Sequence, residues 1–213
     1  MGCALSGTGV DSAKSSSEVN GSAPGPAGGS APASAPPPSL SEEQKQLVRE
    51  SWDVLHQDIA RVGIIMFIRL FETHPECKDV FFLFRDIDDL QQLKMNKELQ
   101  SHGLRVMSFI EKSVARLDQE EKLEQLAFEL GRSHCRYNAP PKYYKYVGVQ
   151  FMAVVKPILK EKWTPEVEEA WECHFDYLTT VMKRGYQEAE LRNGQASYSI
   201  QRTAPSNTSQ NVI

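Results

Sequence analysis

LQSHGLRVMSFI (Leu99–Ile110) and LEQLAFELGRSH (Leu123–His134) are the two stretches of the sequence that decide the fold. In each stretch apolar residues recur at steps of three and four, a spacing that places them on one face of an α-helix. Each stripe also carries one histidine, His102 in the first stretch and His134 in the second. The sequence therefore predicts two amphipathic helices, each with a histidine on its apolar face.

Helical spacing continues through residues 40–190, and no alternation of apolar and polar residues predicts a β-strand. Capping-box, proline and N-cap signals set the expected boundaries. Helices are expected from Ser41, from about Asp58 to Pro75, at about 89–117, at 120–134, after Pro140 and Pro141, and from Thr164 with Pro165 in its first position. Pro157 should kink or end the helix after Pro141 early. The fold class predicted is all-α.

The two ends of the chain differ in composition from this core. Residues 1–39 contain no aromatic side chain and are rich in Pro, Gly, Ala and Ser, while residues 191–213 are rich in Ser, Thr, Asn and Gln. Such segments bury too little apolar surface to offset the entropy of ordering. We predict a disordered tether at 1–39, one folded domain at 40–190 and a disordered tail at 191–213.

Composition excludes two classes of protein. With 24 Lys and Arg against 28 Asp and Glu, the 213-residue chain carries a net charge of -4 and has no basic run, which disfavours nucleic acid as a partner. The longest apolar runs are five residues, Ile64–Ile68 and Val80–Phe84, too short for a transmembrane helix. The start of the chain lacks a secretory signal, so we expect the protein to stay in the reducing cytosol. Its four cysteines should then be free thiols.

The two stripe histidines are candidate metal ligands. A single histidine on an apolar face is usually a core residue, and two without further ligands are too few for a structural zinc site. Two are enough as axial ligands of a haem iron, whose remaining ligands come from the porphyrin. A haem would also explain why both stripes stay apolar to their ends.

Five elements of the core resemble, in order and spacing, the signature of the globin family. They are Trp52, Pro75 in THPECKDVFFLF, Phe81, His102-Gly103 in LQSHGLRVM and His134 in LGRSHCRYNAPPKYY. The resemblance covers about residues 40–190. It implies the globin fold, a three-over-three helical sandwich, and iron protoporphyrin (haem b) as cofactor.

The resemblance also implies a role for individual residues. His134 would be the proximal ligand of the iron and His102 the distal histidine. The remaining haem contacts that it implies are Phe67 and Val106 in the distal wall, Phe81 and Phe84 against the porphyrin, Arg105 as a propionate partner, and Leu130 on the proximal side. Ser133, with Leu130, occupies a position that orients the proximal imidazole. Arg105 has the alternative interpretation of a solvated charge on the helix surface.

Within the globins the sequence looks more like the neuroglobin branch than like myoglobin. The 32-residue interval between the two histidines, Phe67 and Arg105 carry this likeness, and the long extension beginning Met1-Gly2-Cys3 points to globin X. Because Phe67 and Val106 leave little to hold a water as a further ligand, and because of this likeness, we expect His102 and His134 both to coordinate the iron when no external ligand is present. The alternative is that His102 stays short of the iron, as in myoglobin-like pockets, and only hydrogen-bonds bound O2. The likeness also implies O2, NO and CO as ligands, with nitrite reduction, redox sensing, electron transfer with a redox partner protein and oxidant protection as candidate activities.

The N-terminus carries a candidate lipidation signal. Met1–Ser6 fits the N-myristoylation pattern, with Gly2 acylated after removal of Met1. One myristoyl chain binds membranes only marginally, and Lys14 is the sole base in the first 39 residues, so palmitoylation of Cys3 is the candidate second signal. We expect the protein at the cytoplasmic face of the plasma membrane, or in the cytosol if it is not acylated.

Small acylated helical proteins also include calcium sensors and membrane scaffolds, which are the two alternative functions. A calcium sensor is excluded because a calcium-binding loop beginning at Asp86 would need Gly at its sixth position and Glu at its twelfth, where this sequence has Gln91 and Lys97. A lipid-anchored helical scaffold or signalling protein without a cofactor is the remaining alternative. It leaves the two stripe histidines unexplained, and an absorption spectrum distinguishes it from a haem protein.

Overall fold

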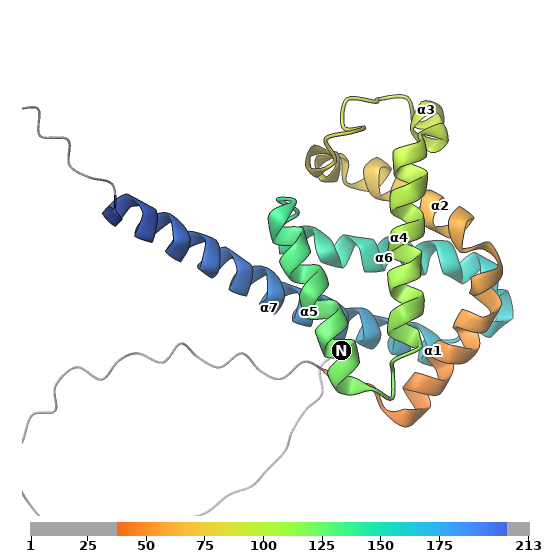
Figure 1. Ribbon diagram of the computed structural model, residues 1–213. Coiled ribbons are helices and arrows are strands. Elements are labelled where there is room, and N and C mark those ends of the chain that lie inside the picture. The colour runs from red at the N-terminus through yellow and green to blue at the C-terminus, as the bar shows by residue number, and fades with distance from the viewer. Residues whose placement is uncertain (1–37, 204–213) are drawn as a thin grey trace, which may run out of the picture. The chain divides into compact units, whose positions relative to one another are not determined.

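The structure is a computed structural model that describes residues 38–203, with side chains placed as far as Gln195. Within these residues all regular elements are helices, which confirms the all-α prediction (Figure 1). The α-helices are α1 (Glu42–Leu55), α2 (Ile59–Thr73), α3 (Leu90–Met95), α4 (Lys97–Val114), α5 (Glu120–Arg136), α6 (Tyr144–Leu159) and α7 (Pro165–Thr203). Short 3-10 turns connect them at His56–Asp58, Pro75–Val80, Pro141–Tyr143 and Lys160–Lys162.

The predicted helix boundaries at Ser41 and Pro75 are present. The Ser41 hydroxyl accepts a hydrogen bond from the Gln44 amide at 3.2 Å, and the Gln44 side chain accepts one from the Ser41 amide at 3.0 Å. This reciprocal pair satisfies amide groups that the first turn of α1 leaves without helical partners. α2 ends at Thr73, because Pro75 forces the preceding residue His74 out of the helical region, to φ -137° and ψ 70°.

One predicted helix is two helices in the structure. The stretch 89–117 is broken at Asn96, whose side chain accepts hydrogen bonds from the amides of Glu98 and Leu99 at 2.9 and 3.0 Å. Asn96 thereby starts α4 as an N-cap and separates it from α3. In contrast, α6 continues through Pro157 and ends only at Leu159, so the proline lies one turn or less from the end.

α7 continues past residue 191, where the predicted C-terminal tail begins. The helix ends at Thr203. Extending an existing helix is much less costly than nucleating one, and Glu188 and Arg192 form an ion pair one turn apart along this part of α7. Residues 1–37 and 204–213, on which the tether and the rest of the tail were predicted, lie outside the described residues.

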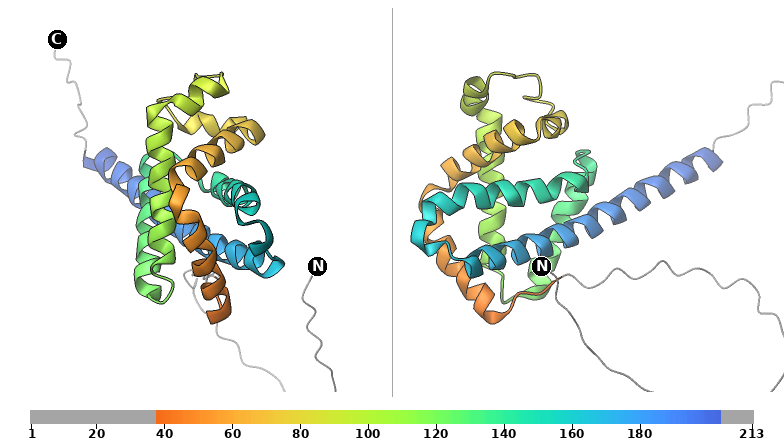
Figure 2. Two further views of the ribbon diagram at one scale, coloured as in Figure 1. Left: turned by 90° about the vertical axis from the view of Figure 1, so that its right-hand side faces the viewer. Right: turned by 180° about the vertical axis from the view of Figure 1, so that it is seen from behind.

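The helices pack around a core rich in aromatic side chains. α5 runs along α7, α2 crosses α4 and α6, and α1 packs against α7. Figure 2 shows these pairings from two further sides, with the last turns of α7 extending away from the other helices. Trp52, Phe67, Phe151 and Trp171 are buried at the centre. No helix in residues 38–203 has the length and apolarity needed to cross a membrane.

α5 and α7 approach each other very closely because glycines stand at their crossing. A Cβ atom added at Gly131 of α5 would lie 1.9 Å from the carbonyl oxygen of Met182 in α7. At Gly185 of α7 it would lie 2.1 Å from the carbonyl oxygen of Phe128. Only glycine allows this separation between the two backbones. The helix that carries His134 is therefore fixed against the longest helix of the domain.

Candidate functional site

His102 lies in α4 among the aromatic rings of two other segments. Its ring centroid is 4.9 Å from that of Phe67 in α2 and 5.1 Å from that of Phe81, both in edge-to-face geometry. Phe67 and Phe81 also contact each other at 5.8 Å. The three rings come from segments that are distant in the sequence. The fold therefore brings His102 and Phe67, which the resemblance placed on the distal side, together with Phe81, which it placed against the porphyrin.

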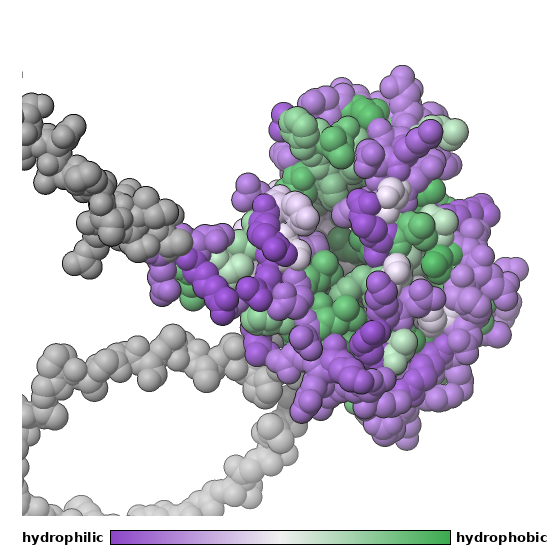
Figure 3. Space-filling model, viewed as in Figure 1, coloured by the Kyte–Doolittle hydropathy of each residue, from purple (hydrophilic) through white to green (hydrophobic). Residues whose placement is uncertain are grey.

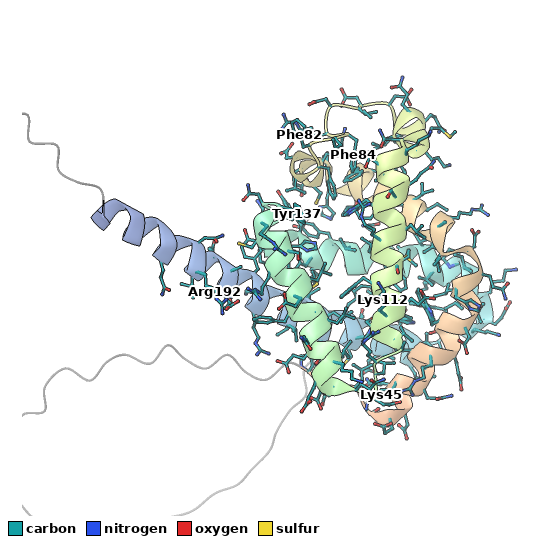
Figure 4. The ribbon with its side chains drawn as sticks, in the orientation of Figure 1. Lys45, Phe82, Phe84, Lys112, Tyr137 and Arg192 are labelled. Carbon is teal, nitrogen blue, oxygen red and sulfur yellow. The ribbon has the colours of Figure 1, made fainter. Side chains whose placement is uncertain are left out.

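Phe84, which the globin resemblance implied as a haem contact, extends this aromatic group. It is 4% exposed and stacks on Phe81 with 5.0 Å between ring centroids. Figure 4 shows Phe84 near α4. The neighbouring Phe82 is 76% exposed, and Leu83 is also exposed. The run of apolar residues at 80–84 is therefore divided between the site and the surface, which its composition does not reveal.

His134 lies near the end of α5 and is fixed by two contacts. Its Nδ1 is 2.9 Å from the carbonyl oxygen of Leu130. A carbonyl only accepts, so Nδ1 carries the hydrogen and Nε2 has the free lone pair. The ring also meets Tyr144 of α6 edge-on at 5.3 Å between centroids. No spacing in the sequence predicts this contact.

The structure refines the predicted orientation of His134. Leu130 is half-buried on the same side and orients the imidazole through its backbone carbonyl. Ser133 has no such contact, because its hydroxyl donates to the carbonyl of Glu129 at 3.0 Å and accepts from Arg136 at 2.9 Å. The role implied for Ser133 is therefore wrong in this structure, whereas that of Leu130 is filled by a main-chain atom.

Both histidines favour the neutral form. Burial, together with the positive charges of Arg105 and His134, lowers the pKa of His102 from 6.5 to about 4. Burial also lowers the pKa of His134, against the opposing effect of the hydrogen bond to Leu130. A neutral imidazole is the form that ligates a metal.

Arg105 and Val106 follow His102 on α4 and lie on different sides of it. Val106 is half-buried and packs against the core. Arg105 is exposed and donates to the Ser101 hydroxyl at 2.7 Å. Its guanidinium therefore lies at the surface close to His102. This position is compatible with both interpretations of Arg105, a solvated charge and the partner of a haem carboxylate.

The face between α4 and α5 is hollowed. Figure 3 shows apolar surface lining this hollow, with polar surface around it. Figure 4 shows Tyr137, which directly follows α5, across this region from Phe84. An apolar hollow bordered by two helices that each carry a histidine fits an iron porphyrin, which needs a large apolar slot and nitrogen ligands.

The other described histidines do not join the site. His174 of α7 is 0% exposed, and its Nε2 donates to the Ser113 hydroxyl at 2.9 Å. His74 stacks on Tyr146 with 3.7 Å between centroids, and His56 is exposed.

The described cysteines are free thiols, as predicted. Cys77, Cys135 and Cys173 form no disulfide. Cys135 follows His134 directly but points to α7, where its sulfur accepts a hydrogen bond from Asn193 at 4.0 Å. Gly2 and Cys3, the predicted lipidation sites, lie outside the described residues.

Comparison with known proteins identifies relatives of the chain. The model of the Globin family matches residues 65–182. Neuroglobin of Tetraodon nigroviridis is 30% identical over 147 residues, which are 69% of this chain and 92% of that protein. Cytoglobin-1 of Oryzias latipes is 27% identical over 150 residues, 70% of this chain and 85% of that protein.

A solved structure shares the fold. A hexacoordinated heme protein from an anhydrobiotic tardigrade, in its crystal structure at pH 4, superposes with a TM-score of 0.65 and 19% sequence identity. The match covers 70% of this chain and 96% of that one. The globin fold predicted from the sequence is thereby confirmed.

Proposed function

The chain belongs to the globin family and is neuroglobin-like, and we propose that His134 and His102 hold a haem iron between them when no external ligand is present. Membership of the globin family implies that the chain binds haem and small gaseous ligands. The observation that supports the finer proposal is that α4 and α5, the two helices bordering the apolar hollow, each carry one of the two histidines.

His134 is suited to be the permanent ligand. The Leu130 carbonyl takes the hydrogen on Nδ1, so the lone pair of Nε2 is fixed in direction before any cofactor binds. The contact with Tyr144 prevents the ring from turning freely. The close packing of α5 on α7 at Gly131 then fixes the helix itself. His134 therefore pays little conformational entropy on binding iron.

His102 is suited to be the exchangeable ligand. Within the described residues no hydrogen bond holds its ring, which rests against the edges of Phe67 and Phe81. Phe67 and Val106 offer no hydrogen-bond donor to order a water in place of His102. An external ligand must then displace His102, and its apparent affinity falls in proportion to the time that the site is open.

We further propose iron protoporphyrin (haem b) as the cofactor. When bound, it would supply the iron that takes O2, NO or CO and that could reduce nitrite. Gated access of this kind suits redox sensing, nitrite reduction or protection against oxidants, with a redox partner protein supplying electrons, better than it suits oxygen storage. Reduction of nitrite by the ferrous protein would be measured as NO release, and should be faster in His102→Leu, which leaves the site open.

The absorption spectrum of the ferrous, ligand-free protein tests the coordination. A low-spin, six-coordinate spectrum is expected for the wild type, and a high-spin spectrum for His102→Leu. His56→Leu removes an exposed histidine and serves as the matched control, with an unchanged spectrum. A high-spin wild type would contradict ligation by His102, and a protein without a Soret band after haem is supplied would favour the cofactor-free scaffold.

The N-terminal motif supports a proposal about location. We infer that Gly2 is myristoylated and Cys3 palmitoylated, which together anchor the protein at the cytoplasmic face of the plasma membrane. Fractionation of cells expressing wild type, Gly2→Ala and Cys3→Ser tests this location. The two variants should move to the soluble fraction, Gly2→Ala completely and Cys3→Ser in part. Equal membrane association of all three proteins would rule out the anchor.

A further inference from the structure

α2 and α4 touch through their backbones at one point, next to His102. A Cβ atom added at Gly63 of α2 would lie 2.7 Å from the carbonyl oxygen and 2.8 Å from the carbonyl carbon of Gly103 in α4. A Cβ atom added at Gly103 would lie 3.0 Å from the carbonyl carbon of Gly63. Ordinary contact begins at 3.4 Å, so neither position accepts a side chain without movement. The two helices are in direct main-chain contact.

This contact lies next to both partners of the distal site. Gly103 directly follows His102 in α4. Gly63 precedes Phe67 by four residues in α2, so the two share one face of that helix. Phe67 is the ring that meets His102 at 4.9 Å. One helix therefore sets both the position of the α4 backbone and the surface on which the His102 ring rests.

The contact is also difficult to deform. Two backbones meet there, and no flexible side chain lies between them that could yield by changing rotamer. Met107, one turn beyond Gly103, is fully buried, and its Cγ would lie 3.0 Å from a Cβ atom at Gly63. A displacement of α4 at this point is therefore transmitted to His102, one residue away.

We propose that the Gly63–Gly103 contact is a positioning device that sets the reach of His102 and thereby the access of small ligands to the site. The inference rests on the coordination by His102 proposed above, which it deepens. His102 has no hydrogen bond within the described residues, so its position depends on where α4 lies and on the Phe67 ring. The crossing of α2 and α4 supplies both.

Added side chains at the crossing should release His102 in a graded manner. Alanine at Gly63 must push α4 away from α2, which draws His102 off the Phe67 ring and removes its support. Alanine at Gly103 meets α2 at 3.0–3.3 Å and needs a smaller shift. Gly148→Ala is the matched control, because it changes another helical glycine whose Cβ would have its nearest contacts with a side chain, that of Phe175 at 3.1 Å.

The experiment compares these variants as haem-loaded full-length proteins. The high-spin fraction of the ferrous spectrum and the rate of CO binding after rapid mixing should both increase several-fold in Gly63→Ala. The increase should be smaller in Gly103→Ala and absent in Gly148→Ala. The same change at Gly63 in a His102→Leu background should leave the CO rate unchanged, because the residue through which it acts has been removed. Thermal melting of each protein reports the structural cost separately.

Several results would overturn the proposal. One is a Gly63→Ala protein whose spin state and CO rate equal those of Gly148→Ala, and another is an equal effect of Gly63→Ala with and without His102. If Gly63→Ala does not fold, Gly103→Ala carries the test alone. A high-spin wild-type spectrum refutes the coordination of the iron by His102. In that case the O2 dissociation rate reports the position of His102. An equal O2 dissociation rate in Gly103→Ala and in the wild type would then refute the positioning role.

Discussion

The surroundings of His134 and His102 differ in what holds each imidazole in place. His134 is held by the hydrogen bond from its Nδ1 to the Leu130 carbonyl, by the Tyr144 ring and by the close packing of its helix on α7. His102 has only ring edges around it and a single backbone contact beside it. The same residue type on two similar amphipathic helices is therefore immobilised in one case and left movable in the other.

This difference assigns roles that the residue types alone do not. A ligand fixed before the cofactor binds contributes most to cofactor affinity, since it loses little freedom on binding. A ligand that can swing away contributes less to affinity but controls what reaches the metal. Substitutions around each histidine test this asymmetry.

Removal of each histidine should have the largest and most unequal effects. His134→Ala is expected to lose haem or to hold it loosely, because the fixed ligand is gone. His102→Ala should keep haem bound by His134. Haem transfer to an excess of an apo-globin acceptor, followed at the Soret band, measures the difference. If His102→Ala loses haem faster than His134→Ala, the assignment of the two roles is reversed.

Crowding of the α5–α7 crossing should loosen the fixed side. A Cβ atom at Gly131 would lie 1.9 Å from the Met182 carbonyl oxygen, so Gly131→Ala is expected to lower the free energy of unfolding by about 3 kcal/mol. It should also speed haem loss, which Gly103→Ala on the movable side should not. Urea unfolding and haem transfer give the two values. Haem loss as fast in Gly103→Ala as in Gly131→Ala would remove the distinction between the two sides.

His174 provides a histidine that is buried without belonging to the site, and so a reference for the other two. Burial lowers its pKa from 6.5 to about 4, so as the pH falls below 6.5 the unfolded chain binds a proton that the folded protein does not. The free energy of unfolding therefore falls between pH 6.5 and about 4. His174→Gln should abolish this contribution, about 2 kcal/mol between about pH 7 and about pH 5.

Urea unfolding of the wild type and of His174→Gln at these two pH values measures the contribution. Because His102 and His134 are present in both proteins, their effects cancel in the comparison. An identical pH dependence of the two proteins would show that His174 titrates normally. His56→Gln, at an exposed position, controls for loss of a histidine as such.

The smallest effect expected is that of the Tyr144 hydroxyl. It donates a hydrogen bond to the Ala139 carbonyl at 3.3 Å, while the ring alone meets His134. Tyr144→Phe should lower the free energy of unfolding by about 1 kcal/mol or less and leave haem affinity unchanged. Haem loss in Tyr144→Phe would show instead that the hydroxyl, and not the ring, keeps His134 in place.

Local signals predicted much of this structure. The apolar stripes, the Ser41 capping box and the stop at Pro75 depend on residues within one or two turns, and all are present. The globin resemblance named Phe67, Phe81 and His102 as haem contacts, whereas the spacing of residues alone does not show that these separate segments meet.

Other features could not be predicted, for identifiable physical reasons. Asn96 starts a new helix through its side chain, although the apolar spacing continues across it. The contact of Tyr144 with His134 depends on the angle between α5 and α6. The continuation of α7 to Thr203 depends on the packed helix before it, and the polar composition of 191–203 gave no sign of it.

The outer part of α7 should behave as a separate unit in hydrogen exchange. Val181, Met182 and Gly185 are buried against the other helices, whereas residues 191–195 are exposed, Leu191 at 68%. Amide hydrogens in the packed part exchange only when the domain opens, but those beyond about residue 190 exchange whenever the helix end frays. A partner protein that bound the outer part of α7 would slow hydrogen exchange of the amides there. The exchange rate of the amides around His134 would stay unchanged.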